Sequence, residues 1–154
     1  MTDIIVQPIG FVRGGRVLPD DDAWGGSEAE IELDVSQFGA EALAGLGEFS
    51  HVEVLFHFDA VKPEEIETGA RRPRGNPAWP KVGIFAQRGR NRPNRIEATI
   101  CEILSVDGTT LRLRGLDAID GTPVIDLKPV MTGFLPRGAV REPGWVKELM
   151  AKYW

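Results

Sequence analysis

The chain has 154 residues, of which 42% are apolar and 27% charged, and its formal net charge is −5. This composition predicts one globular domain over residues 1–154, and it excludes whole-chain disorder and an apolar membrane span of about 20 residues. The single cysteine, Cys101, excludes an internal disulfide and a multi-cysteine zinc site. The residues after Met1 show no signal-peptide pattern, so we expect a cytoplasmic protein with no membrane partner.

Positive charge is concentrated in one segment of the chain. Residues 68–96 carry eight lysines and arginines and no acid, whereas the remainder holds 10 positive and 23 negative charges. One explanation is a solvated loop whose arginines pair with the acidic remainder. The other is a local site for phosphate or carboxylate anions. The net negative charge alone argues against nucleic acid as a partner.

The first half of the chain predicts short strands and little helix. Ile4–Val12 predicts a first strand, and a loop rich in Gly and Asp follows it. Ala29–Val35 and His51–Phe58 alternate between apolar and polar residues, which is typical of half-buried strands. Ser36–Ala44 predicts a short helix capped by its serine, and Pro63 begins a single helical turn.

The second half adds further strands and one terminal helix. Strands are predicted at Val82–Gln87, Ile96–Val106, Leu111–Leu116 and Pro123–Val130, with Asp-Gly turns at 107–108 and 120–121. Residues 62–80 are mostly irregular. Apolar residues spaced four apart predict a C-terminal helix over about 142–153. The six or seven short, mostly antiparallel strands indicate a mainly β fold, a small barrel or sandwich, and the missing helical crossovers disfavour a parallel sheet.

The segment Gly83–Ile96 is the strongest candidate for a functional loop. It holds four arginines within eight positions: Arg88, Arg90, Arg92 and Arg95. Guanidinium groups suit two-point recognition of carboxylate or phosphate, and Pro93 stiffens the loop. We therefore favour an anion-binding loop over a basic hairpin tip.

Other candidate residues have simpler explanations. Asp117, Asp120 and Asp126 lie among turn-forming residues, and turn chemistry alone accounts for them. His51 and His57 share one strand face without a third ligand, so we expect no metal. Cys101 lies among apolar strand residues and is expected in the core.

Four short motifs stand out in the second half of the chain: Ala86-Gln87-Arg88-Gly89, Arg92-Pro93-Asn94-Arg95-Ile96, Asp120-Gly121-Thr122-Pro123 and Asp126-Leu127-Lys128-Pro129. Together they resemble the TsaA-like family, whose best-known members are tRNA N6-threonylcarbamoyladenosine methyltransferases. They match in order and spacing, and the similarity covers about residues 9–130. The chain is shorter than those members and departs from their pattern. The family's Pro-Arg-Gln segment after the first strand is missing, and Arg95 and Glu97 replace a Pro and a Gly.

The resemblance implies a homodimeric, S-adenosylmethionine-dependent methyltransferase on a small antiparallel β-barrel, with tRNA as substrate and no metal. By position, the implied cofactor contacts are Arg88, Ala98, Asp120, Gly121, Thr122, Pro123, Asp59, Ala60 and Trp24. The Trp24 ring could stack on adenine or simply pack in the core.

The remaining roles that follow from the resemblance concern the substrate. Arg90, Arg92 and Arg95 would contact RNA phosphates, and Asp120 or Asp126 would accept the proton of the methylated nitrogen. Two other hypotheses stay open at this point: methylation of a small metabolite, and a barrel that binds S-adenosylmethionine without catalysis.

Overall fold

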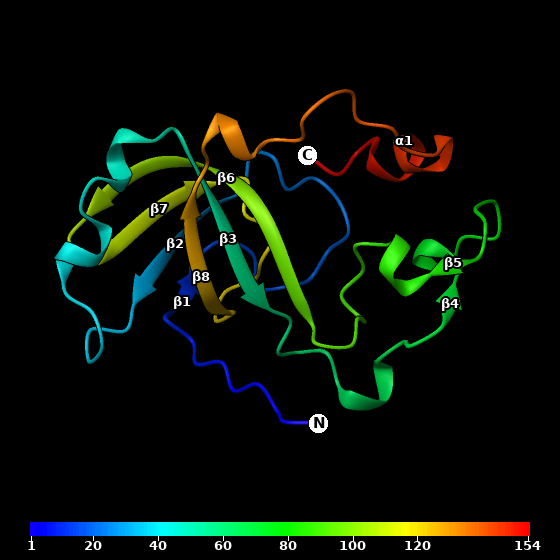
Figure 1. Ribbon diagram of the computed structural model, residues 1–154, viewed down its shortest axis with the longest axis horizontal. Helices are drawn as coiled ribbons and strands as arrows, with labels where there is room; N and C mark the ends of the chain where they lie inside the picture. Colours follow the sequence, from blue (N-terminus) through cyan, green and yellow to red (C-terminus); the bar gives the residue numbers. More distant parts are fainter.

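Six strands close into an antiparallel barrel in the computed structural model, which describes residues 1–154 (Figure 1). Around the barrel the order is β1, β2, β7, β6, β3, β8. These strands are β1 (Gly10–Arg13), β2 (Glu28–Leu33), β3 (His51–His57), β6 (Ile96–Asp107), β7 (Thr110–Arg114) and β8 (Pro123–Pro129). A separate small sheet pairs β4 (Ala70–Arg71) with β5 (Val82–Gly83). The predicted mainly β barrel is confirmed.

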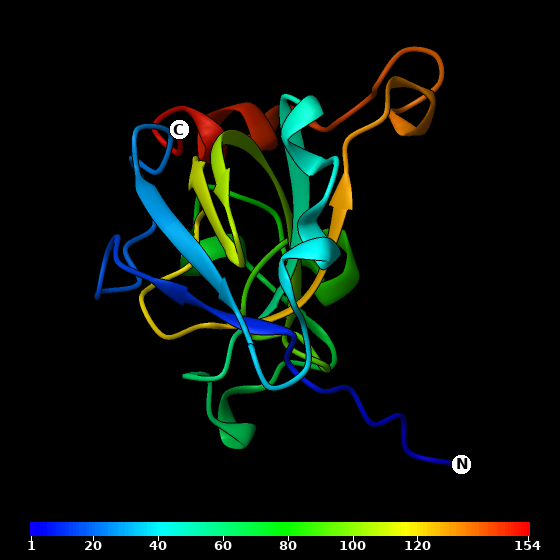
Figure 2. The ribbon, with the colours of Figure 1, turned by 90° about the vertical axis from the view of Figure 1, so that its left-hand side faces the viewer.

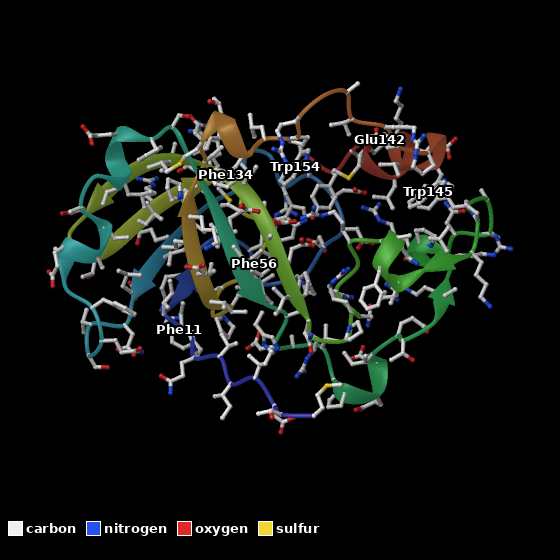
Figure 3. The ribbon with its side chains drawn as sticks, in the orientation of Figure 1. Phe11, Phe56, Phe134, Glu142, Trp145 and Trp154 are labelled. Carbon is white, nitrogen blue, oxygen red and sulfur yellow. The ribbon has the colours of Figure 1, made fainter.

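Alternating side chains on these strands fill the barrel. Val52, Val54 and Phe56 of β3 are fully buried, and Figure 3 shows Phe56 inside the barrel. Ile31 of β2 and Leu111 of β7 are equally inaccessible. Burying each large apolar side chain contributes roughly 1.5–3 kcal/mol. The predicted alternation is confirmed for β3 and for Ala29–Leu33 of β2, whereas Val35 lies beyond the end of β2 and is exposed. Cys101 lies in the same core.

The first strand begins later than the sequence predicts, because its partner strand is short. Gly10 pairs with Leu33, the last residue of β2, so residues before Gly10 have no β2 partner. Ile4 and Ile5 are exposed instead. A Cβ at Gly10 would lie 2.3 Å from the Glu32 carbonyl oxygen, so the close strand approach requires glycine.

Two other predicted elements were wrong in type or extent. Residues 36–44 contain a 3₁₀ turn, η1 (Ala40–Leu43), because the Ser36 hydroxyl bonds to Asp34 and caps nothing. A second 3₁₀ turn, η2 (Leu46–Glu48), follows. The strand predicted over 82–87 ends at Gly83 and continues as the 3₁₀ turn η5 (Ile84–Ala86). The predicted turn at Pro63 is confirmed as η3 (Pro63–Glu65). Two further 3₁₀ turns are η4 (Pro73–Gly75) and η6 (Thr132–Phe134).

The C-terminal helix α1 spans Gly144–Met150, which is shorter than predicted at both ends. Pro143 occupies the cap position before its first turn. After the helix, the carbonyls of Lys152 and Tyr153 accept hydrogen bonds from Ala23 and Trp24. These bonds tie the end of the chain to the β1–β2 connection. No helix of the protein is long and apolar enough to cross a membrane.

The strand order gathers three long connections at one end of the barrel, which we call the mouth. They are residues 14–27, 58–95 and 115–122. Phe56 near the end of β3 pairs with Glu97 of β6 and Val124 of β8, which brings the connections 58–95 and 115–122 level. The connection 14–27 joins them where the Gly14 N–H donates to Asp120. The segment 58–95 and α1 lie to the right of the barrel in Figure 1. η1 and η2 cover the opposite, far end, which faces the viewer in Figure 2.

Candidate active site

The cofactor positions implied by the sequence motifs all lie on segments at the mouth. Arg88 follows η5, and Ala98 lies at the start of β6. The turn 120–123 leads into β8, and residues 59–60 follow β3. Trp24 lies in the β1–β2 connection. Residues up to about a hundred positions apart in sequence are thus brought to one end by the antiparallel order.

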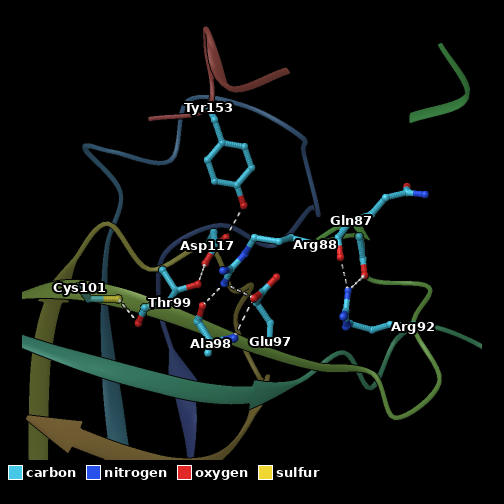
Figure 4. Close-up of polar contacts among 10 residues, drawn as sticks. Gln87, Arg88, Arg92, Glu97, Ala98, Thr99, Cys101, Asp117 and Tyr153 are labelled. Carbon is cyan, nitrogen blue, oxygen red and sulfur yellow. Dashed lines mark hydrogen bonds and ion pairs between the residues drawn. The ribbon is translucent and has the colours of Figure 1, made fainter. Parts of the chain in front are cut away.

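Arg88 and Glu97 form the central ion pair at the mouth (Figure 4). The Arg88 Nη2 donates to Glu97 Oε1 at 2.6 Å and also to the carbonyl of Ala98. The Arg88 side chain is 75% exposed, whereas that of Glu97 is only 10% exposed. The other guanidinium nitrogens of Arg88 make no hydrogen bond within the chain, so they are available to an anionic ligand.

Glu97 is a functional candidate that sequence reasoning missed. It shares strand parity with Thr99 and Cys101, and all three point into the barrel. Burial raises the pKa of Glu97 above its ordinary value, and the nearby Asp117 carboxylate acts in the same direction. Hydrogen bonds from Ala98 N–H and Arg88 oppose that rise. The strand alternation would have placed this acid inside, but its partner Arg88 is identified only by the fold.

Asp117 forms a second polar group beside this ion pair. Its Oδ1 accepts a hydrogen bond from Thr99 Oγ1 at 2.6 Å, and its Oδ2 accepts one from the Tyr153 hydroxyl. Burial raises the pKa of Tyr153 well above its usual value, and the Asp117 charge adds to this rise. Both oxygens of Asp117 are therefore occupied by groups of the chain itself. The tie between Tyr153 and Asp117 anchors the C-terminal segment at the mouth.

Most arginines of the basic segment, residues 68–96, are bound to neutral oxygens. Arg92 donates to the Gln87 carbonyl at 2.7 Å, and Arg95 donates to the Val61 carbonyl at 2.6 Å. Arg71 donates to the Asn91 side-chain oxygen at 3.2 Å. Of the two explanations for the charge cluster, pairing with acids holds only for Arg88 and for Arg74, which pairs with Asp22.

These contacts separate the three arginines that the resemblance assigned to RNA phosphates. Arg92 and Arg95 donate to carbonyls that shape the loop. Arg90 is exposed and makes no hydrogen bond within the chain, so its charge is the one directed to solvent. The loop is thus held by its own arginines, and a ligand is not needed to explain their clustering.

The two predicted catalytic aspartates are not brought together. Asp120 Oδ1 accepts from the Gly14 N–H at 2.9 Å at the mouth. Asp126 lies in the middle of β8, pairs with Lys128 at 2.8 Å, and lines a cavity of about 480 Å³. That cavity is bounded by the η1 and η2 segment at the far end. Of this pair, only Asp120 lies at the same end of the barrel as Arg88.

Trp24 and Cys101 have structural surroundings. Trp24 is 3% exposed, its indole N–H donates to the Asp20 carbonyl, and the Arg16 guanidinium lies 4.2 Å from its ring centre. Of the two roles left open for Trp24, these contacts support packing. Burial raises the pKa of the Cys101 thiol to about 12, so the thiolate is scarce at neutral pH.

Comparison with known proteins identifies the family. The family model described as "tRNA-methyltransferase O N-terminal domain" matches residues 19–134. A mouse protein named tRNA (adenine(37)-N6)-methyltransferase is 41% identical over 139 residues, which cover 86% of this chain and 32% of that protein. A probable S-adenosyl-L-methionine-binding protein of Methanothermobacter thermautotrophicus is 36% identical, covering 82% of this chain and 90% of the relative.

A solved structure agrees with this assignment. The crystal structure of TrmO from Pseudomonas aeruginosa superposes with a TM-score of 0.72 at 27% identity, covering 91% of this chain and 61% of that one. The chain thus spans about a third of the mouse relative and most of the archaeal one. The resemblance drawn from the four motifs is confirmed. This chain belongs to the tRNA-methyltransferase O family and carries that family's N-terminal domain.

Proposed function

We propose that this chain is an S-adenosylmethionine-dependent methyltransferase that acts on N6 of a modified adenosine in tRNA. The observation that carries the proposal is that Arg88 contacts Ala98 at the barrel mouth, the end at which the turn 120–123 also lies, in a member of this family. Relatives named as tRNA methyltransferases and as S-adenosyl-L-methionine-binding proteins support it.

The side chains at the mouth fit the charges of this cofactor. S-adenosylmethionine carries a carboxylate, an ammonium group, ribose hydroxyls and a sulfonium cation. Arg88 supplies an exposed guanidinium edge, while Asp59 and Asp120 supply exposed carboxylates. When bound, the cofactor supplies a methyl group activated by the sulfonium sulfur. Mouths of small β-barrels are common ligand sites.

In this proposal the residues of the chain orient the reactants and accept a proton. Arg88 holds the cofactor carboxylate through its unused N–H groups. Adenine N6 is a weak nucleophile, because its lone pair is delocalised, so alignment and proton removal are the main tasks. Asp120 is the aspartate of the predicted pair at the mouth, and its Oδ2 makes no hydrogen bond within the chain. Asp120 is therefore the acceptor we propose for the N6 proton.

Cofactor binding is the first test of the proposed function. Calorimetric titration with S-adenosylmethionine should give micromolar binding to the wild type. We expect Arg88→Ala to weaken binding by about tenfold or more, because it removes a charge-assisted hydrogen bond worth roughly 1.5–3 kcal/mol. The matched control is Arg112→Ala, which removes an exposed arginine paired with Glu28 on the outer barrel surface. Absence of wild-type binding at millimolar cofactor would contradict the proposal.

A second candidate function is cofactor binding without methyl transfer. It is supported by the archaeal relatives named as S-adenosyl-L-methionine-binding proteins, of which this chain covers 88–90%. Transfer of labelled methyl groups from S-adenosylmethionine to tRNA separates the two functions. Incorporation at adenine N6 supports the methyltransferase, whereas cofactor binding with no incorporation supports the second candidate.

A further inference from the structure

We propose that Glu97 binds the α-ammonium group in the methionine part of S-adenosylmethionine. With Arg88 on the carboxylate, Glu97 would complete a two-point clamp for the amino acid end of the cofactor. The inference rests on the proposed function and adds to it a binding residue that the sequence motifs do not contain. Glu97 stands where the family pattern stated above has glycine, so this contact would be specific to chains that carry the acid.

The first argument is charge complementarity at short range. An α-amino acid carries its carboxylate and its ammonium on one carbon, so a site for both needs opposite charges side by side. Arg88 and Glu97 present such charges with 2.6 Å between Nη2 and Oε1. A ligand carboxylate that binds the free edge of Arg88 necessarily brings its ammonium within a few ångströms of the same guanidinium. Glu97 is the carboxylate bonded to that guanidinium.

The second argument is that Glu97 has hydrogen-bonding capacity left. Its Oε1 accepts from Arg88 Nη2 and from the Ala98 N–H at 2.8 Å, whereas Oε2 accepts no hydrogen bond within the chain. Asp117, its acidic neighbour, has both oxygens occupied by Thr99 and Tyr153. Oε2 is not among the fully buried side-chain atoms that lack a partner, of which Arg71 Nε is the only one, so it keeps contact with solvent and is open to a donor from a ligand. An ammonium group is such a donor.

The third argument is that the surroundings also favour a cation over an anion at this point. Asp117 adds a second negative charge near Glu97, as its effect in raising the pKa of Glu97 shows. The Ala98 carbonyl beside Glu97 is a further acceptor, which Arg88 already contacts. Ala98 is also one of the cofactor positions that the motifs implied. The same few atoms therefore present acceptors to a cation next to the arginine that would hold its carboxylate.

The competing explanation is that Glu97 only holds Arg88 in position. The two roles differ in which ligands are affected when the charge of Glu97 is removed. A positioning role would disturb Arg88 and the neighbouring backbone, so it would affect ligands with a carboxylate whether or not they carry an ammonium. Direct binding of the ammonium affects only ligands that have one.

The test is calorimetric binding of four ligands to Glu97→Gln and to wild type. S-adenosylmethionine and S-adenosylhomocysteine carry the full amino acid, a deamino analogue of S-adenosylhomocysteine keeps only its carboxylate, and 5′-methylthioadenosine has neither group. We expect Glu97→Gln to weaken the first two by about tenfold or more, consistent with loss of a charged hydrogen bond. Affinity for the deamino analogue and for 5′-methylthioadenosine should stay within about twofold.

The matched control is Glu102→Gln on the same strand. Glu102 is exposed and pairs with Arg114 at 3.2 Å on the outer surface, so this variant should bind all four ligands as the wild type does. A wild-type measurement stands independently of any variant and remains decisive if Glu97→Gln does not fold. The wild type should bind S-adenosylhomocysteine at least about tenfold more tightly than its deamino analogue.

Each outcome decides the inference. Unchanged binding of S-adenosylhomocysteine to Glu97→Gln, or equal wild-type affinity for the deamino analogue, overturns it and leaves the proposed function intact. If Glu97→Gln weakens binding of the deamino analogue as much as binding of S-adenosylhomocysteine, Glu97 has a positioning role and the ammonium contact is overturned. Failure of the wild type to bind S-adenosylmethionine removes the proposed function, and the inference with it.

Discussion

At the scale of single residues, Glu97 is the position where stability and ligand binding conflict. Its side chain is 10% exposed and points into a barrel whose other inward residues are mainly apolar. Moving a carboxylate away from water is unfavourable, and one partial ion pair with an exposed arginine offsets only part of that cost. The raised pKa of Glu97 expresses the same imbalance.

This imbalance predicts that Glu97→Gln stabilises the protein at neutral pH. Because the folded-state pKa of Glu97 is raised above 4.5, its ordinary value, the fold holds the protonated form more tightly than the unfolded chain does. The contribution of Glu97 to stability is therefore greatest below its ordinary pKa and is lost as pH rises through the raised folded-state pKa. Urea unfolding should show Glu97→Gln more stable than wild type at pH 7, with the difference narrowing below about pH 4.5.

The outer-surface variant Glu102→Gln serves again as the control, because Glu102 is exposed and should show no such gain. A Glu97→Gln protein that is less stable than wild type at pH 7 would contradict the prediction. It would mean that the bonds from Arg88 and Ala98 outweigh the effect of burial.

At the scale of elements, the turn that carries Arg88 is held by one buried amide. Gln87 is 8% exposed, and its Nε2 donates to the carbonyls of Arg71 at 3.0 Å and Val82 at 2.9 Å. The main-chain carbonyl of Gln87 accepts a hydrogen bond from Arg92. This residue therefore connects the small β4–β5 sheet to the basic loop and sets the backbone from which Arg88 extends.

Gln87→Leu should therefore loosen the segment 68–96 without unfolding the barrel. Removing the amide leaves buried carbonyls without a donor, which costs about 1–3 kcal/mol. Limited proteolysis should cut this segment faster than in wild type, and S-adenosylmethionine binding should weaken with it. Gln37→Leu, at an exposed glutamine of the far-end connection, is the control. Equal cleavage rates for Gln87→Leu and wild type would argue against the role of the amide.

How far the sequence predicts these elements depends on where their partners lie. β3, β6 and β8 follow from alternation and turn residues within the strands themselves, and they match to within about two residues. The strand predicted over 82–87 was wrong beyond Gly83. There the Gln87 side chain donates to the Arg71 carbonyl, a long-range contact that no local pattern shows. Likewise, the motifs predicted positions at the mouth, but the bonds of Arg92, Arg95 and Tyr153 depend on long-range packing.

At the scale of the whole molecule, the segment after β8 is one of the apolar segments that the chain leaves exposed. Met131, Phe134, Leu135 and Val140 follow β8 and are exposed, with Phe134 at 89%. Figure 3 shows Phe134 at the edge of the barrel. We propose that this segment packs against a second copy of the chain in the homodimer implied by the family resemblance. Contiguous exposed apolar side chains are typical of such surfaces.

Phe134→Ser should then weaken the dimer while leaving the monomer stable, because the ring makes little contact within its own chain. Sedimentation at micromolar concentration should show a dimer for wild type and a larger monomer fraction for the variant. Val35→Ser removes another exposed apolar side chain at the far end and should leave the dimer unchanged. A wild-type monomer under these conditions would exclude this assembly.

The barrel is joined least extensively where β1 meets β8. Only Gly10 and Phe11 pair there, with Val124 and Pro123, whereas β3 and β6 share seven paired positions. The seam joins residues about 110 positions apart, so its closure carries a high entropic cost during folding. The backbone bonds from Val12 to Thr122 and from Gly121 to Val12 form as this seam closes. We therefore expect the turn 120–123 to acquire its shape late in folding, and a ligand bound to that turn to stabilise the closed barrel as well.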